Sequence, residues 1–187
     1  MARRPLRRDR RPALEERPGP VEGSVVRAAT AADIGSVIEL RILMFEAMGT
    51  PDEDLYDPRW RADAARWLQL HLDDAGVAVV VADVGGAVVS CAMGQVVDLM
   101  PSPTRRGDVG GLLTNVATFP SHRRRGLSQA CVEGVLDWFT QSTRVDVVTL
   151  NATAEGAPMY EALGFTPSQF PEMRARLTRE PTPPEAG

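Results

Sequence analysis

The stretch at residues 76–100, GVAVVVADVGGAVVSCAMGQVVDLM, limits the fold of this chain more than any other part of the sequence. It contains two runs rich in valine, and β-branched residues of this kind are typical of strands. The runs meet at Gly85-Gly86, a dipeptide that favours a two-residue hairpin turn. The sequence therefore predicts two neighbouring antiparallel strands, and any fold must be built around a sheet.

Strand and helix signals alternate on both sides of this hairpin. A short strand SVVRAA precedes a helix over residues 31–49, which Thr30 and Asp33 begin as an N-cap with an acidic first turn. After a loop at residues 50–60, Asp57-Pro58 opens a second helix that continues to about Leu72.

The second half of the chain predicts a strand GGLLTNVATF (110–119), a helix over about 125–140, a strand RVDVVTLNA (144–152), a short helix GAPMYEALG (156–164) and a closing strand near EMRARL (172–177). The order β-α-α-β-β-β-α-β-α-β is typical of an α+β fold with a mixed central β-sheet flanked by helices. Its strand-helix-strand segment predicts a right-handed parallel crossover.

The 187 residues suit one domain, which we place at residues 25–177. Residues 1–24 hold seven of the 21 arginines and four prolines, so they predict a disordered arm; residues 178–187 predict a flexible tail. The arm is interpreted as a solvated tail or as a tether for nucleic acid. Without it, 14 arginines face 21 acidic residues, and this acidic body makes nucleic acid an unlikely main ligand.

Composition excludes several kinds of chemistry. The chain has no lysine, which rules out a lysine Schiff base. Cys91 and Cys131 lack metal-like spacing and are interpreted as core thiols, while two distant histidines provide too few ligands for zinc, so we expect no metal. No apolar run reaches the ~20 residues of a membrane span and no signal peptide is apparent, which predicts a cytoplasmic protein.

Positive charge is concentrated in PSHRRRGLSQA (120–130), where a helix is predicted to begin. A helix N-terminus carries unpaired backbone N–H groups and a partial positive charge, so it binds phosphate where the backbone can come close. Gly126 has no Cβ to block that approach, Arg123, Arg124 and Arg125 add charge, and Ser128 offers a hydroxyl or only a small side chain. The segment predicts an anion site sized for a diphosphate; a merely solvated basic turn is the alternative.

This loop, together with VVTLNATAEGAPMYEALGF about 20 residues later, resembles the GCN5-related N-acetyltransferase (GNAT) family over about residues 25–177. In that family a Q/R-x-x-G-x-G/A loop holds the pyrophosphate of acetyl-CoA, and Arg123 to Ser128, with Gly126 and Leu127 between them, matches it. Ser128 replaces the usual final Gly or Ala. The resemblance implies the GNAT fold and acetyl-CoA as cofactor.

The resemblance also implies roles for residues beyond the loop. The strand at 115–119 should pair with the pantetheine arm, and the next strand should splay away to open a slot for the thioester. Backbone N–H groups near Val116, Ala117 and Thr118 would then polarise the acetyl carbonyl.

Tyr160 matches the family's general acid, with packing against the cofactor as the alternative. Asn151 is expected to bind the cofactor or to cap the turn. Where the family often has a further asparagine, seven residues before the tyrosine, this chain has Thr153.

A general base is harder to assign. Histone-type members use a glutamate on the strand before the loop, and the corresponding place here falls near Leu112. Five acidic residues lie between Glu46 and Asp57 without an arginine, which suits either a cationic substrate or a plain solvated loop. Glu46, beside apolar residues at the end of its helix, is our candidate for a base or amine anchor.

These observations predict acetyl transfer from acetyl-CoA to an amine of a small, cationic molecule or of a protein N-terminus. Attack is expected to be direct, in a ternary complex, because neither cysteine has a basic partner in sequence. The alternative is a non-catalytic acyl-CoA-binding regulatory protein. Exposed final strands make a homodimer plausible.

Overall fold

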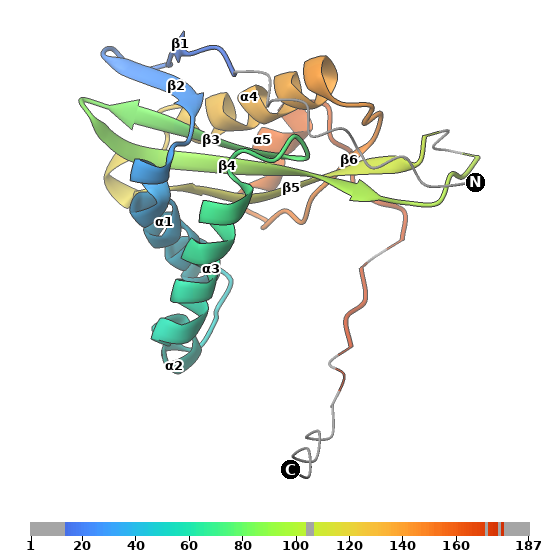
Figure 1. Ribbon diagram of the computed structural model, residues 1–187, viewed down its shortest axis with the longest axis horizontal. Coiled ribbons are helices and arrows are strands. Elements are labelled where there is room, and N and C mark those ends of the chain that lie inside the picture. Colours follow the sequence, from blue (N-terminus) through green and yellow to red (C-terminus); the bar gives the residue numbers. More distant parts are fainter. Residues whose placement is uncertain (1–13, 104–106, 171, 176, 178–187) are drawn as a thin grey trace, which may run out of the picture.

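The computed structural model describes residues 14–103, 107–170, 172–175 and 177, and its centre is a six-stranded sheet (Figure 1). The strands follow the chain in spatial order, β1-β2-β3-β4-β5-β6, and all neighbours are antiparallel except β5 and β6, which are parallel. Their bounds are Arg17–Pro18, Ser24–Ala28, Val77–Val84, Ala87–Asp98, Val109–Thr118 and Val148–Thr149. The predicted mixed sheet is confirmed.

The predicted hairpin joins β3 to β4. Val84 pairs with Ala87, which leaves Gly85 and Gly86 as the two turn residues. Their φ angles are 62° and 88°, a conformation that L side chains rarely adopt. The turn therefore depends on both glycines.

Helices cover both faces of the sheet (Figure 1). The helices α1 and α3 lie on one face, with α2 between them in the chain, and α4 and α5 lie on the other. The bounds are α1 Ile34–Ala47, α2 Asp52–Leu55, α3 Pro58–His71, α4 Leu127–Ser142 and α5 Ala157–Ala162, and single 3-10 turns span Ala31–Asp33 and Pro120–His122. Alternate residues of the central strands point to opposite faces, so the domain has one apolar core on each side.

The predicted helix starts are confirmed. Asp57 accepts a hydrogen bond from the Arg59 backbone N–H at 2.9 Å, and Pro58 is the first helical residue. Ahead of α1, Asp33 accepts from the backbone N–H of Thr30 at 2.7 Å and forms an ion pair with Arg27 at 2.7 Å. Asp33 thus joins the helix start to β2.

Residues 14–24 differ from the disorder predicted for residues 1–24. Arg17–Pro18 pairs with β2, and the Arg17 guanidinium contacts the Asp137 carboxylate at 2.7 Å and the Ala130 carbonyl at 3.0 Å. The expectation is wrong at these residues because α4 supplies partners that composition does not show. Residues 1–13 and the predicted tail at 178–187 lie outside the described residues.

The predicted closing strand is also wrong for the residues that can be described there. Residues 172–175 and 177 belong to no strand, and their side chains are exposed, Met173 to 93%. β6 is only two residues long, so the sheet offers little edge for another strand to bury its side chains against. The loop predicted at 50–60 contains the short helix α2.

Both cysteines are buried and free, as core thiols should be. Across the part of the chain that the structure describes, no helix is long and apolar enough to span a membrane. The cytoplasmic location stays a prediction of the sequence.

Candidate functional site

A gap in the sheet defines the site. β6 pairs with β5 only where Gly111 faces Val148 and Leu112 faces Thr149. Beyond these pairs the chain leaves the sheet, so among the described residues no strand neighbours the edge of β5 from Leu113 to Thr118 on that side. The two strands separate as the sequence predicts.

β5 carries a bulge along this open edge. Met93 of β4 faces Thr114 and Cys91 faces Ala117, so Ala92 alone faces two residues, Asn115 and Val116. Asn115 has a φ of 54°, in the left-handed region that asparagine tolerates better than most residues. A bulge re-aims backbone and side-chain groups, so Thr114 and Asn115 both face the α1 side of the sheet.

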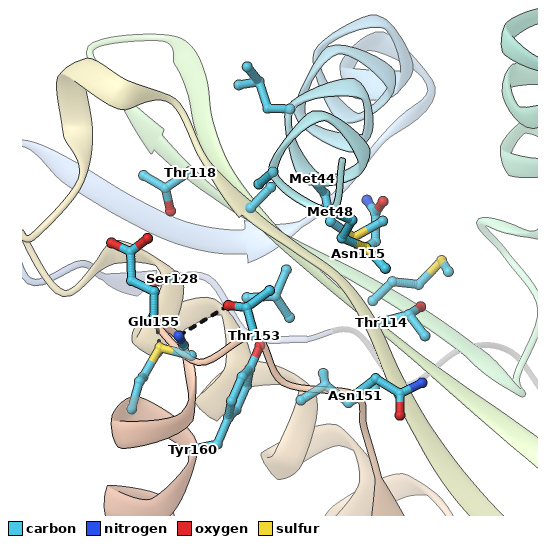
Figure 2. A pocket seen from close by; sticks show the side chains of 18 of the residues that line it. Met44, Met48, Thr114, Asn115, Thr118, Ser128, Asn151, Thr153, Glu155 and Tyr160 are labelled. Atoms are coloured by element: carbon cyan, nitrogen blue, oxygen red, sulfur yellow. Dashed lines mark hydrogen bonds between the residues drawn. The ribbon is translucent and has the colours of Figure 1, made fainter. Parts of the chain in front are cut away.

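A cavity of about 780 Å³ runs through the gap. Its walls come from the last turns of α1, the open edge of β5, the loop before α4 and the segment from Asn151 to Tyr160. Figure 2 shows Met44, Met48, Thr114 and Asn115 on one side and Ser128 and Glu155 on the other. The cavity therefore connects the α1 face of the sheet to the α4 face.

The N-terminus of α4 forms one end of this cavity. Gly126 precedes the helix with a φ of 77°, and its carbonyl accepts from the N–H of Ala130 at 3.0 Å. The N–H groups of the three residues between them therefore have no partner within the helix. The first turn contains no acidic residue, so an anion would meet no repulsion from the helix itself.

The arginines of the loop are arranged around this helix end. Arg123 lines the cavity and donates from Nε to the Thr118 carbonyl at 3.2 Å. Arg124, whose φ is 60°, lines it too and lies 3.4 Å from the Glu155 carboxylate. Arg125 is exposed and does not line the cavity.

Tyr160 lines the middle of the cavity, and its side chain points toward Thr153 in Figure 2. It is only 9% exposed and packs edge-on against Phe165, with ring centroids 5.9 Å apart. Burial raises the pKa of its hydroxyl, which therefore stays protonated at neutral pH. Tyr160 is positioned by α5, whose preceding turn is capped by Thr153: its Oγ1 accepts from the Gly156 N–H at 3.2 Å.

Most of the residues that the sequence singles out lie together on the wall. They are Val116, Ala117, Thr118, Arg123, Arg124, Gly126, Leu127, Ser128, Asn151 and Tyr160. Glu46 does not line the cavity: its side chain is exposed in the last turn of α1, although its neighbours Ala47 and Met48 do line it. The acidic residues that follow it, at 52–57, are absent from the described wall as well.

The wall is more basic than the sequence suggests. Among the described lining residues the only carboxylate is that of Glu155, which is 74% exposed, whereas four arginines line the cavity. Sequence reasoning did not single out Arg41 of α1 or the loop residue His122 as site residues, and both line the cavity. The signal available in the sequence was that Arg41 places a charge on the apolar side of this helix.

Comparisons with known proteins agree with this geometry. The model of the acetyltransferase (GNAT) family matches residues 38–165. The crystal structure of a GCN5-related N-acetyltransferase from Ralstonia eutropha JMP134 is similar with a TM-score of 0.73 and 27% identity, over 83% of this chain and 99% of that one. No curated protein matches.

Two further structures share the fold at lower identity. A predicted acetyltransferase with acetyl-CoA from Clostridium acetobutylicum has a TM-score of 0.69 and 20% identity, over 81% of this chain and 96% of that one. A transcriptional regulator from Bacillus halodurans C-125 has a TM-score of 0.65 and 16% identity, over 82% and 99%.

Proposed function

The chain belongs to the acetyltransferase (GNAT) family, whose model covers well over half of it, and we propose that it transfers the acetyl group of acetyl-CoA to an amine. The acceptor is an amine of a small molecule or of a protein N-terminus, attacked directly in a ternary complex. The observation that carries the proposal is the cavity that joins the N-terminus of α4 to the open edge of β5.

The residues at the helix end fit acetyl-CoA. A Cβ on Gly126 would point toward Pro20 at 3.4 Å and the residue adopts a positive φ, so glycine keeps this turn tight and its backbone approachable. The free N–H groups of the α4 first turn, with Arg123 and Arg124 beside them, would hold the pyrophosphate. Ser128 faces the same end of the cavity.

The bound thioester would supply an electrophilic carbonyl. A carbon–nitrogen bond would form to the neutral amine, the carbon–sulfur bond would break, and sulfur would take that electron pair and a proton from a general acid. The nitrogen would give up one proton and keep one hydrogen as the amide, and the general acid would regain its proton from solvent. The open edge of β5 would bind the pantetheine arm through backbone groups. At the bulge, backbone N–H groups near Val116 to Thr118 would stabilise charge that develops on the carbonyl oxygen.

Tyr160 would provide the proton for the leaving sulfur. Its hydroxyl has no hydrogen-bond partner among the described residues, it lines the cavity, and its raised pKa keeps the proton in place. The cysteines are unsuited to covalent catalysis, because burial raises the pKa of Cys91 and raises that of Cys131 to about 12. The buried cysteines therefore favour direct attack of the amine on the thioester over a route through an acetylated cysteine.

The proton of the incoming ammonium needs a different acceptor. Glu46, the sequence hypothesis for an amine anchor or base, does not line the cavity, and the described wall holds no buried carboxylate. We infer that water carries the proton away. The value of kcat/KM should then rise tenfold per pH unit up to the pKa of the acceptor amine, with no plateau near neutral pH, and Glu46→Gln should leave that profile unchanged.

One preparation tests the proposal. Calorimetry measures acetyl-CoA affinity, and release of free thiol is followed with a panel of amines. Tight binding with release on one amine class supports the enzyme. Tight binding without release on any amine supports the regulatory alternative, and absence of binding refutes our assignment of the helix end.

Tyr160→Phe separates the two roles of the tyrosine. We expect turnover to fall about 100- to 10,000-fold, because a positioned proton donor contributes on this scale, while acetyl-CoA affinity stays nearly unchanged. Equal turnover in the variant would reduce Tyr160 to a packing residue.

A further inference from the structure

Arg41 is a cation placed in an apolar surrounding. It lies on α1 four residues before Phe45, and its guanidinium carbon sits 4.8 Å from the centre of the Phe45 ring. Its Nη1 donates to Oδ1 of Asn115, the residue at the bulge of β5, at 3.0 Å. The side chain therefore reaches from α1 to the open edge of the sheet, and it lines the cavity.

No carboxylate balances this charge among the described residues. The ion pairs of that part of the chain do not include Arg41, and its one polar partner, Asn115, is neutral. Burial lowers the pKa of the Arg41 guanidinium, since removal from water disfavours the charged form. A guanidinium has five N–H donors, and Asn115 is the one acceptor of Arg41 among the described residues, so the remaining donors can bind a ligand in the cavity that Arg41 lines.

A second polar group nearby lacks a partner. The hydroxyl of Thr114 is buried and forms no hydrogen bond in the described structure. Thr114 lines the same cavity and precedes Asn115, and the bulge turns both residues toward the α1 face. Buried polar groups are rarely left unsatisfied, so an unpaired hydroxyl and an unpaired cation on one wall indicate a ligand that satisfies both.

These groups lie at the end of the cavity away from the α4 N-terminus. Figure 2 shows Thr114 and Asn115 beside Met44 and Met48, whereas Ser128 and Glu155 lie across the cavity. α1 and α4 cover opposite faces of the sheet. The donor phosphates therefore use the α4 end, and Arg41 remains for the acceptor.

We propose that the acceptor carries a carboxylate, which pairs with Arg41 and accepts a hydrogen bond from Thr114, so that the substrate is an amino acid or an amino-acid-like amine. This inference rests on the proposed function. A carboxylate fits the planar fork of a guanidinium with two parallel hydrogen bonds, and pairing within the cavity removes the cost of a buried lone charge. The apolar side chains of Met44 and Met48 leave the rest of the acceptor to be bound by contact rather than by charge.

The test compares each of the common amino acids, and β-alanine, with the corresponding carboxamide, and adds spermidine and agmatine as amines without a carboxylate. For the best acceptor we expect kcat/KM to exceed that of its carboxamide by about 30- to 100-fold, the scale of a lost buried charge pair. Acetyl-CoA affinity is measured by calorimetry in the same preparation.

Variants of Arg41 separate recognition of the acceptor's carboxylate from a structural role in supporting the bulge at Asn115. Arg41→Gln keeps a donor for Asn115 but removes the charge, so the preference for carboxylate over carboxamide should fall to within about threefold. Arg41→Lys should retain part of it. Arg66→Gln, on the exposed surface of α3 and outside the cavity, is the matched control and should keep the full preference.

Each outcome decides whether Arg41 binds a carboxylate of the acceptor. A purely structural Arg41 would make Arg41→Gln lower kcat/KM equally for acid and carboxamide, which overturns the proposal. Acetylation of spermidine, agmatine or the carboxamides in preference to every carboxylated amine overturns it as well and leaves the acetyltransferase intact. Binding of acetyl-CoA with acetylation of no amine in either set refutes the proposed function and this inference with it.

Discussion

Replacing Gly126 by aspartate and by asparagine tests the anion site at the start of α4. Both new side chains have nearly the same shape, and both must adopt the positive φ of 77°, which costs an L residue about 1–2 kcal/mol and asparagine somewhat less. A Cβ at this position meets Pro20 at 3.4 and 3.5 Å, ordinary contact distances, so neither variant clashes. The pair therefore differs mainly in charge.

The aspartate should act as an internal competitor for the ligand. At the N-cap its carboxylate can accept from the free N–H groups of the α4 first turn, and it repels a phosphate bound there. Two unit charges about 6 Å apart interact by about 3 kcal/mol at an effective dielectric constant of about 20, and exposure to water reduces this to about 2 kcal/mol. We expect Gly126→Asp to bind acetyl-CoA about 30-fold more weakly than Gly126→Asn.

Calorimetry at two salt concentrations and with a second ligand completes the assay. The ratio between the variants should shrink as salt rises, because exposed charges are screened. It should vanish for acetyl-pantetheine, which lacks the pyrophosphate. Equal acetyl-CoA affinities in the aspartate and asparagine variants would refute the assignment of this helix end as the phosphate site.

Further predictions concern stability. Burial opposes the charged form of Asp33, but hydrogen bonds from Arg27 and Thr30 outweigh it and hold the pKa of this carboxyl below its usual value, so its contribution is present above about pH 4 and is lost as the pH falls through the lowered pKa. Asp33→Asn should lower the free energy of unfolding by about 2 kcal/mol at pH 7, measured with urea, and a difference that persists unchanged at pH 2 would contradict this. Gly94→Ala should destabilise by about 1–3 kcal/mol, because its Cβ would lie 2.5 Å from Val135 Cγ1; an unchanged melting temperature would show that α4 can move away. Native Cys91 and Cys131 should resist thiol reagents that label them after unfolding, and labelling of the folded protein would show that the core opens.

Local signals were sufficient for much of the fold. Two valine-rich runs around Gly85-Gly86 predicted the β3–β4 hairpin, and Asp57-Pro58 predicted the start of α3, because turn and cap chemistry acts over a few residues. Strand and helix signals predicted the order of the elements from β2 to α5, apart from the short helix α2, and did not predict β1. The closing strand failed, since six residues with an alternating pattern form a strand only if a sheet edge receives them.

The sequence by itself determined where we propose the phosphate site, because a glycine, three arginines and a helix start are contiguous in the chain. Only the tertiary structure decided the other end of the cavity. The bulge at Asn115 depends on the register between β4 and β5, and Arg41 reaches it from 74 residues away. Whether an arginine within an apolar helix stripe is paired, solvated or left for a ligand is a property of its surroundings, and those are set by packing rather than by neighbours in sequence.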